Sequence, residues 1–335
     1  MTLLSVPVID IAPFRGGSAP DRAAVAAEVA RACADIGFLV ITGHGVAQDL
    51  VDAMYRASKE FFESPVETKL AVARPEAGQI RGYSGVEQEG LGLLEDEPVP
   101  ADLKESFDIG PLDVPADNPY YTCAQAGAHF APNLWPERPP EFERVYRRYY
   151  GAMEALTREM FRIFATALEL PTDFFADKVD RHISLLRANY YPPQPNEPKP
   201  NQLRGGAHSD YTAMTILWQE DVPGGGLQVR NKAGQWVDVP AVPGTFVVNL
   251  GDSLERWTND KWVSTMHRVV NPPRDVAATH SRVSIPSFVQ PNYDAVIECI
   301  DSCFDEEHPA KYGPVRNGEY LYMKFTQQNT LASVD

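Results

Sequence analysis

The sequence has no long hydrophobic run and no excess of positive charge. No stretch of its 335 residues approaches the roughly 18 consecutive apolar residues of a membrane-spanning helix. The opening MTLLSVPVIDIAPF contains no basic residue and reaches Pro7 and Asp10 early, which is atypical of a secretory signal peptide. Lysine and arginine total 30 against 46 acidic residues, a net charge of −16. Because this charge repels phosphate groups and anionic lipids, we expect no nucleic-acid partner and no membrane partner.

Cysteine is also scarce. The four cysteines, Cys33, Cys123, Cys299 and Cys303, do not have the spacing of a zinc site. Thiols that serve as small hydrophobic side chains are typical of a reducing compartment. We therefore expect a cytoplasmic protein.

The order of patterns along the chain predicts a single domain over 1–335. A helical and loop-rich part, 1–180, is expected to pack on a β-rich core, 181–293, and a C-terminal segment, 294–335, is expected to lie over the active site. Periodicity predicts helices over 21–36, 48–65 and 141–170, the first capped by Asp21, and short strands over VPVIDIAPF, which ends at Pro13, and GFLVITGHG.

The second half is rich in short β-type runs. They are SLLRANYYPP, YTAMTILWQ, GGLQVRN, QWVDVP, GTFVVNLGD, VSTMHRVVNPP and RVSIPSFVQP, separated by Gly, Pro, Asn or Asp. Many short strands at even spacing predict a sandwich, a jelly roll or a barrel. The N-terminal helices are expected to cover the outside of this β core.

The run GGAHSDYTAMTIL contains a His-x-Asp pair, His208 and Asp210. On a strand, residues i and i+2 point to the same face, so both side chains can reach one ion. His267 follows 57 residues after Asp210 in another β-type run and can supply a third ligand, although a histidine in that setting also serves as a hydrogen-bonded core residue. Two histidines and one carboxylate form the facial triad of non-haem iron(II) oxygenases. Zinc hydrolases with similar ligands usually carry a helical HExxH motif, which this sequence lacks.

A second constellation suits a carboxylate. Arg282 and Ser284 stand two apart in SRVSIPSF, so a guanidinium and a hydroxyl share one face of a strand. If Arg282 points inward, it needs an anionic partner, because an unpaired buried charge is costly. If it points outward, it indicates no binding site. Asn189 and Tyr191, in RANYYPP, share a strand face in the same way and can complete a polar pocket.

Taken in order, NYYPP, HSD, NLGD, His267 and RVS resemble the isopenicillin N synthase-like family of iron(II)/2-oxoglutarate-dependent oxygenases, over nearly the whole chain. The resemblance implies a double-stranded β-helix (jelly-roll) core flanked by N-terminal helices. It also implies Fe(2+) as cofactor, with 2-oxoglutarate and O2 as cosubstrates. By the same resemblance the iron ligands are His208, Asp210 and His267, and the residues that hold 2-oxoglutarate are Arg282, Ser284, Tyr191 and Asn189.

One departure concerns the 15-residue step from His267 to Arg282, where PPRDVAATH is inserted. It resembles the bacterial cephalosporin-forming branch and is expected to lengthen a hairpin. His280, within this insertion, is expected to be an exposed loop residue. His44, in a GHG turn, is expected to be structural.

The family resemblance implies a dioxygenase that oxidises an unactivated C–H bond of a small molecule, a reaction typical of secondary metabolism. 2-Oxoglutarate would be converted to succinate and CO2, and the outcome would be hydroxylation, desaturation or cyclisation. One alternative is a 2-oxoglutarate-independent oxidase of the penicillin-forming or ethylene-forming type, in which the arginine serves the substrate. Another is a non-enzymatic cupin-like binding protein. The sequence does not indicate the prime substrate or the oligomeric state.

The expected substrate contacts lie in three parts of the chain. Arg187 and Tyr190 lie at the NYYPP motif, whereas Arg81 and Tyr83 lie in IRGYSG and Phe325 lies in the C-terminal segment. The Gly- and Pro-rich segment 72–136, with one strand near ESFDIG, and the last twenty or so residues, including Tyr320, are expected to form a mobile lid over the iron.

Overall fold

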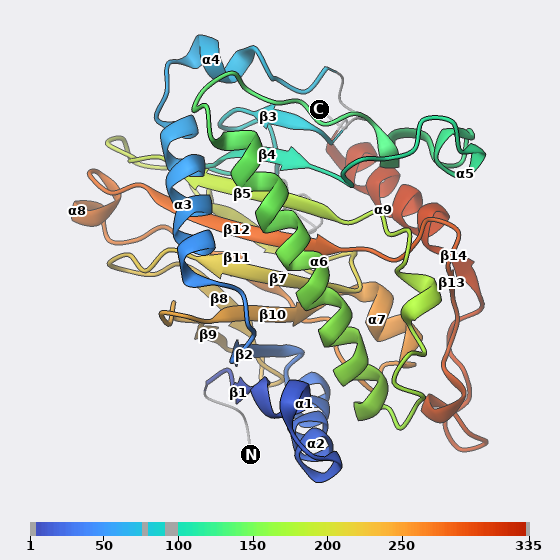
Figure 1. Cartoon of the computed structure of the whole chain (residues 1–335). Helices are drawn as coiled ribbons and strands as arrows, with labels where there is room; N and C mark the ends of the chain where they lie inside the picture. Colours follow the sequence, from blue (N-terminus) through green and yellow to red (C-terminus); the bar gives the residue numbers. More distant parts are fainter. Residues whose placement is uncertain (1–4, 76–79, 91–99, 333–335) are drawn as a thin grey trace.

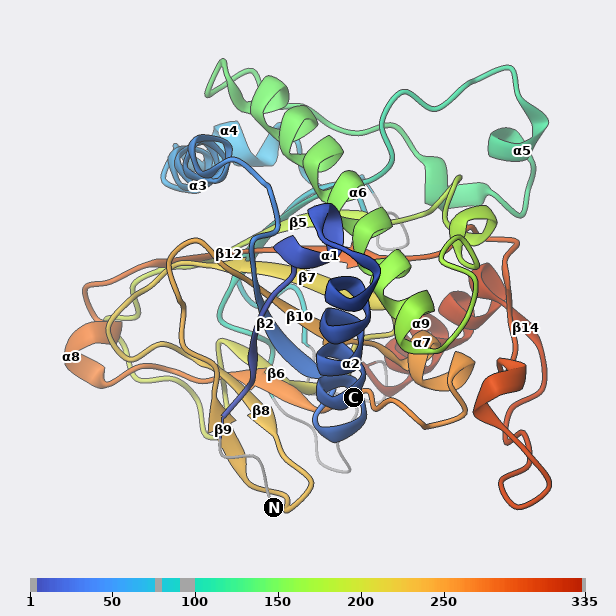
Figure 2. The same ribbon diagram turned by 60° about the horizontal axis from the view of Figure 1, so that its bottom comes forward.

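The computed structural model describes residues 5–75, 80–90 and 100–332, although the side chains of 128 and 325–332 are not among the described groups. Two β-sheets face each other, and the long helices cover the outer side of the larger one. Figure 2 shows α3 and α6 on one side of this sheet and the smaller sheet on the other. None of the described helices has the length and apolar character that a membrane span requires.

The larger sheet contains eight strands. Their spatial order is β1 (Val8–Asp10), β2 (Phe38–Thr42), β10 (Phe246–Leu250), β7 (Met214–Gln219), β12 (Arg282–Val289), β5 (Leu185–Tyr191), β4 (Glu105–Ile109) and β3 (Gly82–Ser84). β1 and β2 pair in parallel, and the other neighbours pair antiparallel.

The smaller sheet has the order β6 (Gly205–His208), β11 (His267–Val269), β8 (Leu227–Arg230) and β9 (Trp236–Asp238). A two-stranded sheet, β13 (Val296–Ile297) with β14 (Val315–Arg316), lies outside this pair. From β5 to β12 successive strands alternate between the larger and the smaller sheet, except that β8 and β9 form a hairpin within the smaller one, and this is the arrangement of a jelly roll. The predicted double-stranded β-helix core with N-terminal helices is confirmed.

Three long helices cover the larger sheet (Figure 1). They are α2 (Ala19–Asp35), α3 (Gln48–Phe62) and α6 (Phe142–Ala167). Short helices occupy the connections: α1 (Ala12–Gly16), α4 (Val66–Leu70), α5 (Pro119–Thr122), η2 (Gly127–Phe130), η3 (Ala176–Lys178), α7 (Asp252–Trp257), α8 (Arg274–Ala277) and η4 (Asp301–Cys303). The last helix is α9 (Asn317–Ala332).

The predicted helices and strands are present, with local corrections. Ser18, not Asp21, is the N-cap of α2, and the Asp21 carboxylate instead accepts a hydrogen bond from the Ser18 backbone N–H as part of a capping box. Pro13 lies inside α1 rather than ending a strand, because proline is tolerated in the first turn of a helix. The segment 72–136 contains β3, α5 and η2 as well as the expected strand near ESFDIG.

Alternation along β5 separates apolar residues on its outer face from polar residues on its inner face. In β5, Leu186 and Tyr190 join the hydrophobic core under the helices, so Asn189 and Tyr191 face the space between the sheets. Polar residues that are buried on an inner face need partners within the barrel. The fold therefore buries the polar side chains of Asn189 and Tyr191 in the space between the two sheets.

Candidate active site

His208 and His267 meet at the β6–β11 ladder. His208 is the last residue of β6, His267 is the first of β11, and the register pairs them directly. Asp210 follows two residues after His208, with its Oδ1 3.6 Å from Nε2 of His208 and 3.8 Å from Nε2 of His267. The three ligand atoms lie within 4.8 Å of one another. The structure therefore brings together the three residues that the sequence predicted as ligands.

The expectation that His208 and Asp210 share a strand was wrong. β6 ends at His208, and Asp210 lies in the connection to β7. Thr215 and Asn249 orient its carboxylate, because Oδ2 accepts hydrogen bonds from Thr215 Oγ1 at 2.6 Å and from Asn249 Nδ2 at 2.7 Å. Oδ1 is thereby left to face the two histidines.

Both imidazole rings are held by backbone carbonyl oxygens. Nδ1 of His208 lies 2.8 Å from the carbonyl oxygen of Gly206, and Nδ1 of His267 lies 3.1 Å from that of Thr265. A carbonyl oxygen only accepts, so each Nδ1 carries the proton and each Nε2 keeps its lone pair. Such hydrogen bonds behind the ligand atoms are typical of metal sites.

The charges of these groups suit a divalent metal. Burial lowers the pKa of His208 to about 4, with a further contribution from His267, so its imidazole is neutral near pH 7. Burial alone raises the pKa of Asp210, but the two histidines and the hydrogen bonds from Thr215 and Asn249 outweigh it, and the net shift is downward. Two imidazole nitrogens and one carboxylate oxygen fit iron(II) with open coordination positions.

Arg282 forms the second part of the site. It is the first residue of β12 and lies opposite Tyr191 of β5, while Ser284 lies opposite Asn189. The inserted PPRDVAATH segment does not lengthen a hairpin, because β11 and β12 lie in different sheets; it forms the connection that contains α8 and leaves the pairing of β12 with β5 intact. Ser284 Oγ lies 3.4 Å from the Tyr191 hydroxyl and 3.5 Å from Asn189 Nδ2.

The Arg282 guanidinium is buried and only partly satisfied. Arg282 is 1% exposed. Its Nη2 donates a hydrogen bond to Gln219 Oε1 at 2.7 Å. Nε and Nη1 have no hydrogen-bond partner in the described part of the chain. Burial lowers the pKa of Arg282 because it disfavours the charged form. A buried cation with free N–H groups fits an incoming carboxylate such as that of 2-oxoglutarate.

Two further histidines lie as we expected, His44 in a structural role and His280 as an exposed loop residue. His44 Nε2 lies 3.1 Å from the Gly244 carbonyl oxygen, and its ring packs edge-on against Phe246. His280 is exposed and pairs with the hydroxyl of its neighbour Thr279. Neither belongs to the metal cluster of the described residues.

Two of the expected substrate contacts face away from the pocket. Tyr190 lies on the outer face of β5 and stacks on Phe62, with ring centroids 5.3 Å apart. Tyr83 packs in the same outer core and donates its hydroxyl to Glu105 at 2.7 Å. Both tyrosines therefore serve the packing between sheet and helices, and we do not propose them as substrate contacts.

The other expected contacts have different surroundings. Arg187 faces inward but is already bound to Asp108 at 2.7 Å and to Glu89 at 2.8 Å. Arg81 donates to the backbone carbonyl oxygens of Ile80 and His129, each at 2.6 Å, and so fixes the η2 turn. The side chain of Phe325 lies outside the described groups.

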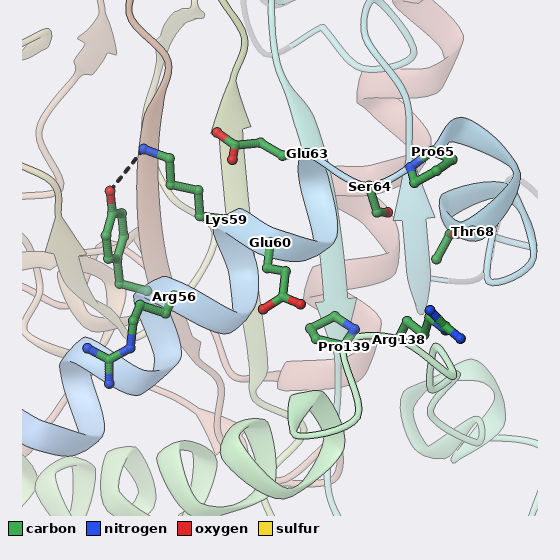
Figure 3. A pocket seen from close by; sticks show the side chains of 10 residues that line it. Arg56, Lys59, Glu60, Glu63, Ser64, Pro65, Thr68, Arg138 and Pro139 are labelled. Atoms are coloured by element: carbon green, nitrogen blue, oxygen red, sulfur yellow. Dashed lines mark hydrogen bonds between the residues drawn. The ribbon is translucent and has the colours of Figure 1, made fainter.

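A separate hollow of about 570 Å³ opens on the outer side of α3. Figure 3 shows Lys59, Glu60 and Glu63 along the helix, with Arg138 and Pro139 on the neighbouring segment. Lys59 Nζ donates to the Tyr55 hydroxyl at 3.1 Å, the interaction drawn as a dashed line. None of the residues that line this hollow belongs to the His–Asp–His cluster or to the Arg282 pocket.

Residues 6–138 match the family described as non-haem dioxygenase in morphine synthesis N-terminal, and residues 182–291 match the 2OG-Fe(II) oxygenase superfamily. The chain is 34% identical to the 2-oxoglutarate-Fe(II) type oxidoreductase hxnY of Emericella nidulans, over 92% of this chain and 86% of the relative. It is 31% identical to a homoarginine-6-hydroxylase of Oryza sativa, over 96% of each. The crystal structure of a full-length Neurospora crassa protein in complex with alpha-KG is similar, with a TM-score of 0.84, 32% identity and 96% coverage of both chains.

Proposed function

Because this chain belongs to the 2OG-Fe(II) oxygenase superfamily, we propose that it uses iron(II), 2-oxoglutarate and O2 to oxidise an unactivated C–H bond of a small molecule. The observation that carries the proposal is the pairing of two features on facing sheets. One is the three-residue metal cluster, and the other is the buried Arg282, whose Nε and Nη1 have no hydrogen-bond partner among the described residues.

The residues have distinct roles in this proposal. His208, Asp210 and His267 hold the iron, and Thr215 and Asn249 keep the Asp210 carboxylate turned toward it. When bound, iron(II) and 2-oxoglutarate supply the oxidising chemistry, with 2-oxoglutarate converted to succinate and CO2.

Arg282 and Ser284 bind the distal carboxylate of 2-oxoglutarate, with Tyr191 and Asn189 beside them. The buried inner face keeps water from the reacting groups.

Hydroxylation is the proposed outcome, and desaturation or ring closure are variants of the same C–H oxidation. Names of relatives, such as homoarginine-6-hydroxylase, support hydroxylation as a reaction type within this family. The four free cysteines support our proposal of a cytoplasmic enzyme, and secondary metabolism is proposed as its setting. Neither the 2-oxoglutarate-independent oxidase nor the cupin-like binder is favoured by the relatives.

The proposal is tested by succinate formation from 2-oxoglutarate in the absence of a prime substrate. We expect slow, iron-dependent succinate release from the wild-type protein and none from Asp210→Ala, with Asp305→Ala, an exposed carboxylate, as matched control. Succinate release by Asp210→Ala at the wild-type rate would overturn the assignment. Oxygen consumption that needs iron and substrate but no 2-oxoglutarate would instead identify the cosubstrate-independent type.

A further inference from the structure

A second arginine, Arg204, lies beside Arg282. Arg204 directly precedes β6 of the smaller sheet and is 1% exposed. Its guanidinium carbon lies 5.8 Å from the centre of the Tyr191 ring, and that of Arg282 lies 5.2 Å from the centre of the same ring. Two guanidinium groups, one from each sheet, therefore flank one phenol ring.

Neither arginine has an acidic partner among the described residues. Arg204 Nε has no hydrogen-bond partner there, and Nη2 donates to the backbone carbonyl of His280 at 3.3 Å. The negative charge of Glu220 favours the charged form of Arg282. Its carboxylate, however, already accepts hydrogen bonds from the Tyr55 hydroxyl at 2.6 Å and from the Val283 N–H at 2.8 Å.

Arg187 shows that the same fold pairs a buried arginine when its role is structural. Arg187 is largely buried, with 12% of its side chain exposed, and Asp108 and Glu89 each bind it through two oxygens. The absence of such partners at Arg204 and Arg282, within the described residues, therefore sets these two apart.

Two buried cations without an acidic partner among the described residues repel each other, and this repulsion destabilises the ligand-free protein. Burial lowers the pKa of Arg204 to about 10, and the nearby charge of Arg282 contributes in the same direction. A pKa near this value leaves Arg204 charged at neutral pH, so the repulsion and the lost hydration persist until an anion enters.

We propose that Arg204 and Arg282 together bind the distal carboxylate of 2-oxoglutarate, and that Arg204 makes the protein selective for 2-oxo acids that carry this second carboxylate. The inference rests on the proposed function and adds a residue outside the Arg282–Ser284 pair. A carboxylate has about four acceptor positions on its two oxygens, enough for both guanidinium groups and the Ser284 hydroxyl.

The test compares two ligands in the manganese(II)-loaded full-length protein, where binding is measured by calorimetry without turnover. 2-Oxoglutarate is compared with 2-oxovalerate, which has the same carbon chain but no distal carboxylate. Arg204→Met should weaken 2-oxoglutarate binding about tenfold or more, because charge-assisted hydrogen bonds are lost, and should leave 2-oxovalerate binding within about twofold. Arg204→Lys should fall between, since it keeps the charge but loses the planar fork.

Arg274→Met is the matched control, because Arg274 lies exposed in α8 and donates to the backbone of Pro195. It should leave the affinities for both ligands unchanged. Arg204→Met should also melt no lower than the wild type without ligand, because it removes an unpaired buried charge. If Arg204→Met does not fold, Arg204→Lys decides the question by the same ratio of affinities.

Three results would overturn the inference. Wild-type 2-oxoglutarate affinity in Arg204→Met, together with its loss in Arg282→Met, would leave the proposed function standing and remove Arg204 from the site. An equal loss of both ligands in Arg204→Met would show a structural role. No binding of 2-oxoglutarate to the wild-type protein would refute the proposed function itself.

Discussion

His208 and His267 face each other directly across the β6–β11 ladder, with ring centroids 4.3 Å apart. This pairing places two imidazole groups from distant parts of the sequence at one point, and Asp210 joins them from the connection that follows β6. Because a ladder fixes the positions of both histidines, the site is held by backbone hydrogen bonds rather than by flexible loops alone.

Removal of any ligand should remove the metal. We predict that His208→Ala, Asp210→Ala and His267→Ala each abolish iron-dependent turnover while the fold is retained, because each supplies one of three protein ligands. Bound iron and circular dichroism are the measurements. The ligand assignment fails if one of the three variants keeps near wild-type activity.

The hydrogen bonds behind Asp210 should tune metal affinity. Thr215→Val and Asn249→Ala each remove one donor to Oδ2 and should weaken iron(II) binding about 10- to 100-fold without abolishing it. Thr166→Val is a suitable control, since that hydroxyl lies on the exposed side of α6. Unchanged iron affinity in both variants would show that the Asp210 carboxylate needs no such support.

Arg282→Ala should raise the KM for 2-oxoglutarate at least about tenfold, since hydrogen bonds to a charged group contribute about 1.5–3 kcal/mol each. Arg282→Lys should give an intermediate value. The KM for the prime substrate should change much less. A collapse of prime-substrate affinity, with no effect of 2-oxoglutarate on turnover in either protein, would assign Arg282 to the substrate.

The C-terminal helix is linked to the site through Asp252. Lys324 of α9 binds the Asp252 carboxylate at 2.9 Å, and the Asp252 N–H donates to the Asp210 carbonyl at 2.8 Å. Lys324 Nζ also lies 5.0 Å from the centre of the Tyr211 ring, beside Asp210, and Tyr320 is buried. These contacts support our proposal that the segment 294–335 covers the iron, and the matching role of 72–136 stays a prediction.

A lid predicts slower hydrogen exchange in both segments when iron and 2-oxoglutarate are bound. Lys324→Ala should reduce that gain in protection for α9, because its link to Asp252 is lost. Peptides from α2, which packs on α6 at the sheet's other end, should exchange equally in both states. Equal protection of α9 with and without ligands would argue against a lid.

Much of the site was predictable because it depends on local spacing. Side chains alternate between the two faces of a strand, so Asn189 and Tyr191 share one face, as do Arg282 and Ser284. Pairing of the two strands then brings the two pairs together. The same alternation puts Tyr190 on the opposite face from Tyr191, so its orientation away from the pocket could have been inferred, although its partner Phe62 could not.

Arg204 could not be found in this way. The sequence does not indicate whether an arginine just before a strand points inward or outward. The approach of Arg204 to Tyr191 also depends on contact between the two sheets. The supports of Asp210 also come from β7 and β10, whose side-by-side arrangement is a long-range property of the fold.

The most direct test of the central claim is an anaerobic titration of the metal-free protein with iron(II) and 2-oxoglutarate, followed by visible absorption. We predict a weak charge-transfer band that needs both additions, disappears in Asp210→Ala and needs more 2-oxoglutarate in Arg282→Ala. If iron(II) binds the wild-type protein and 2-oxoglutarate produces no band at any concentration, the protein does not place this cosubstrate on iron, and the central claim is contradicted.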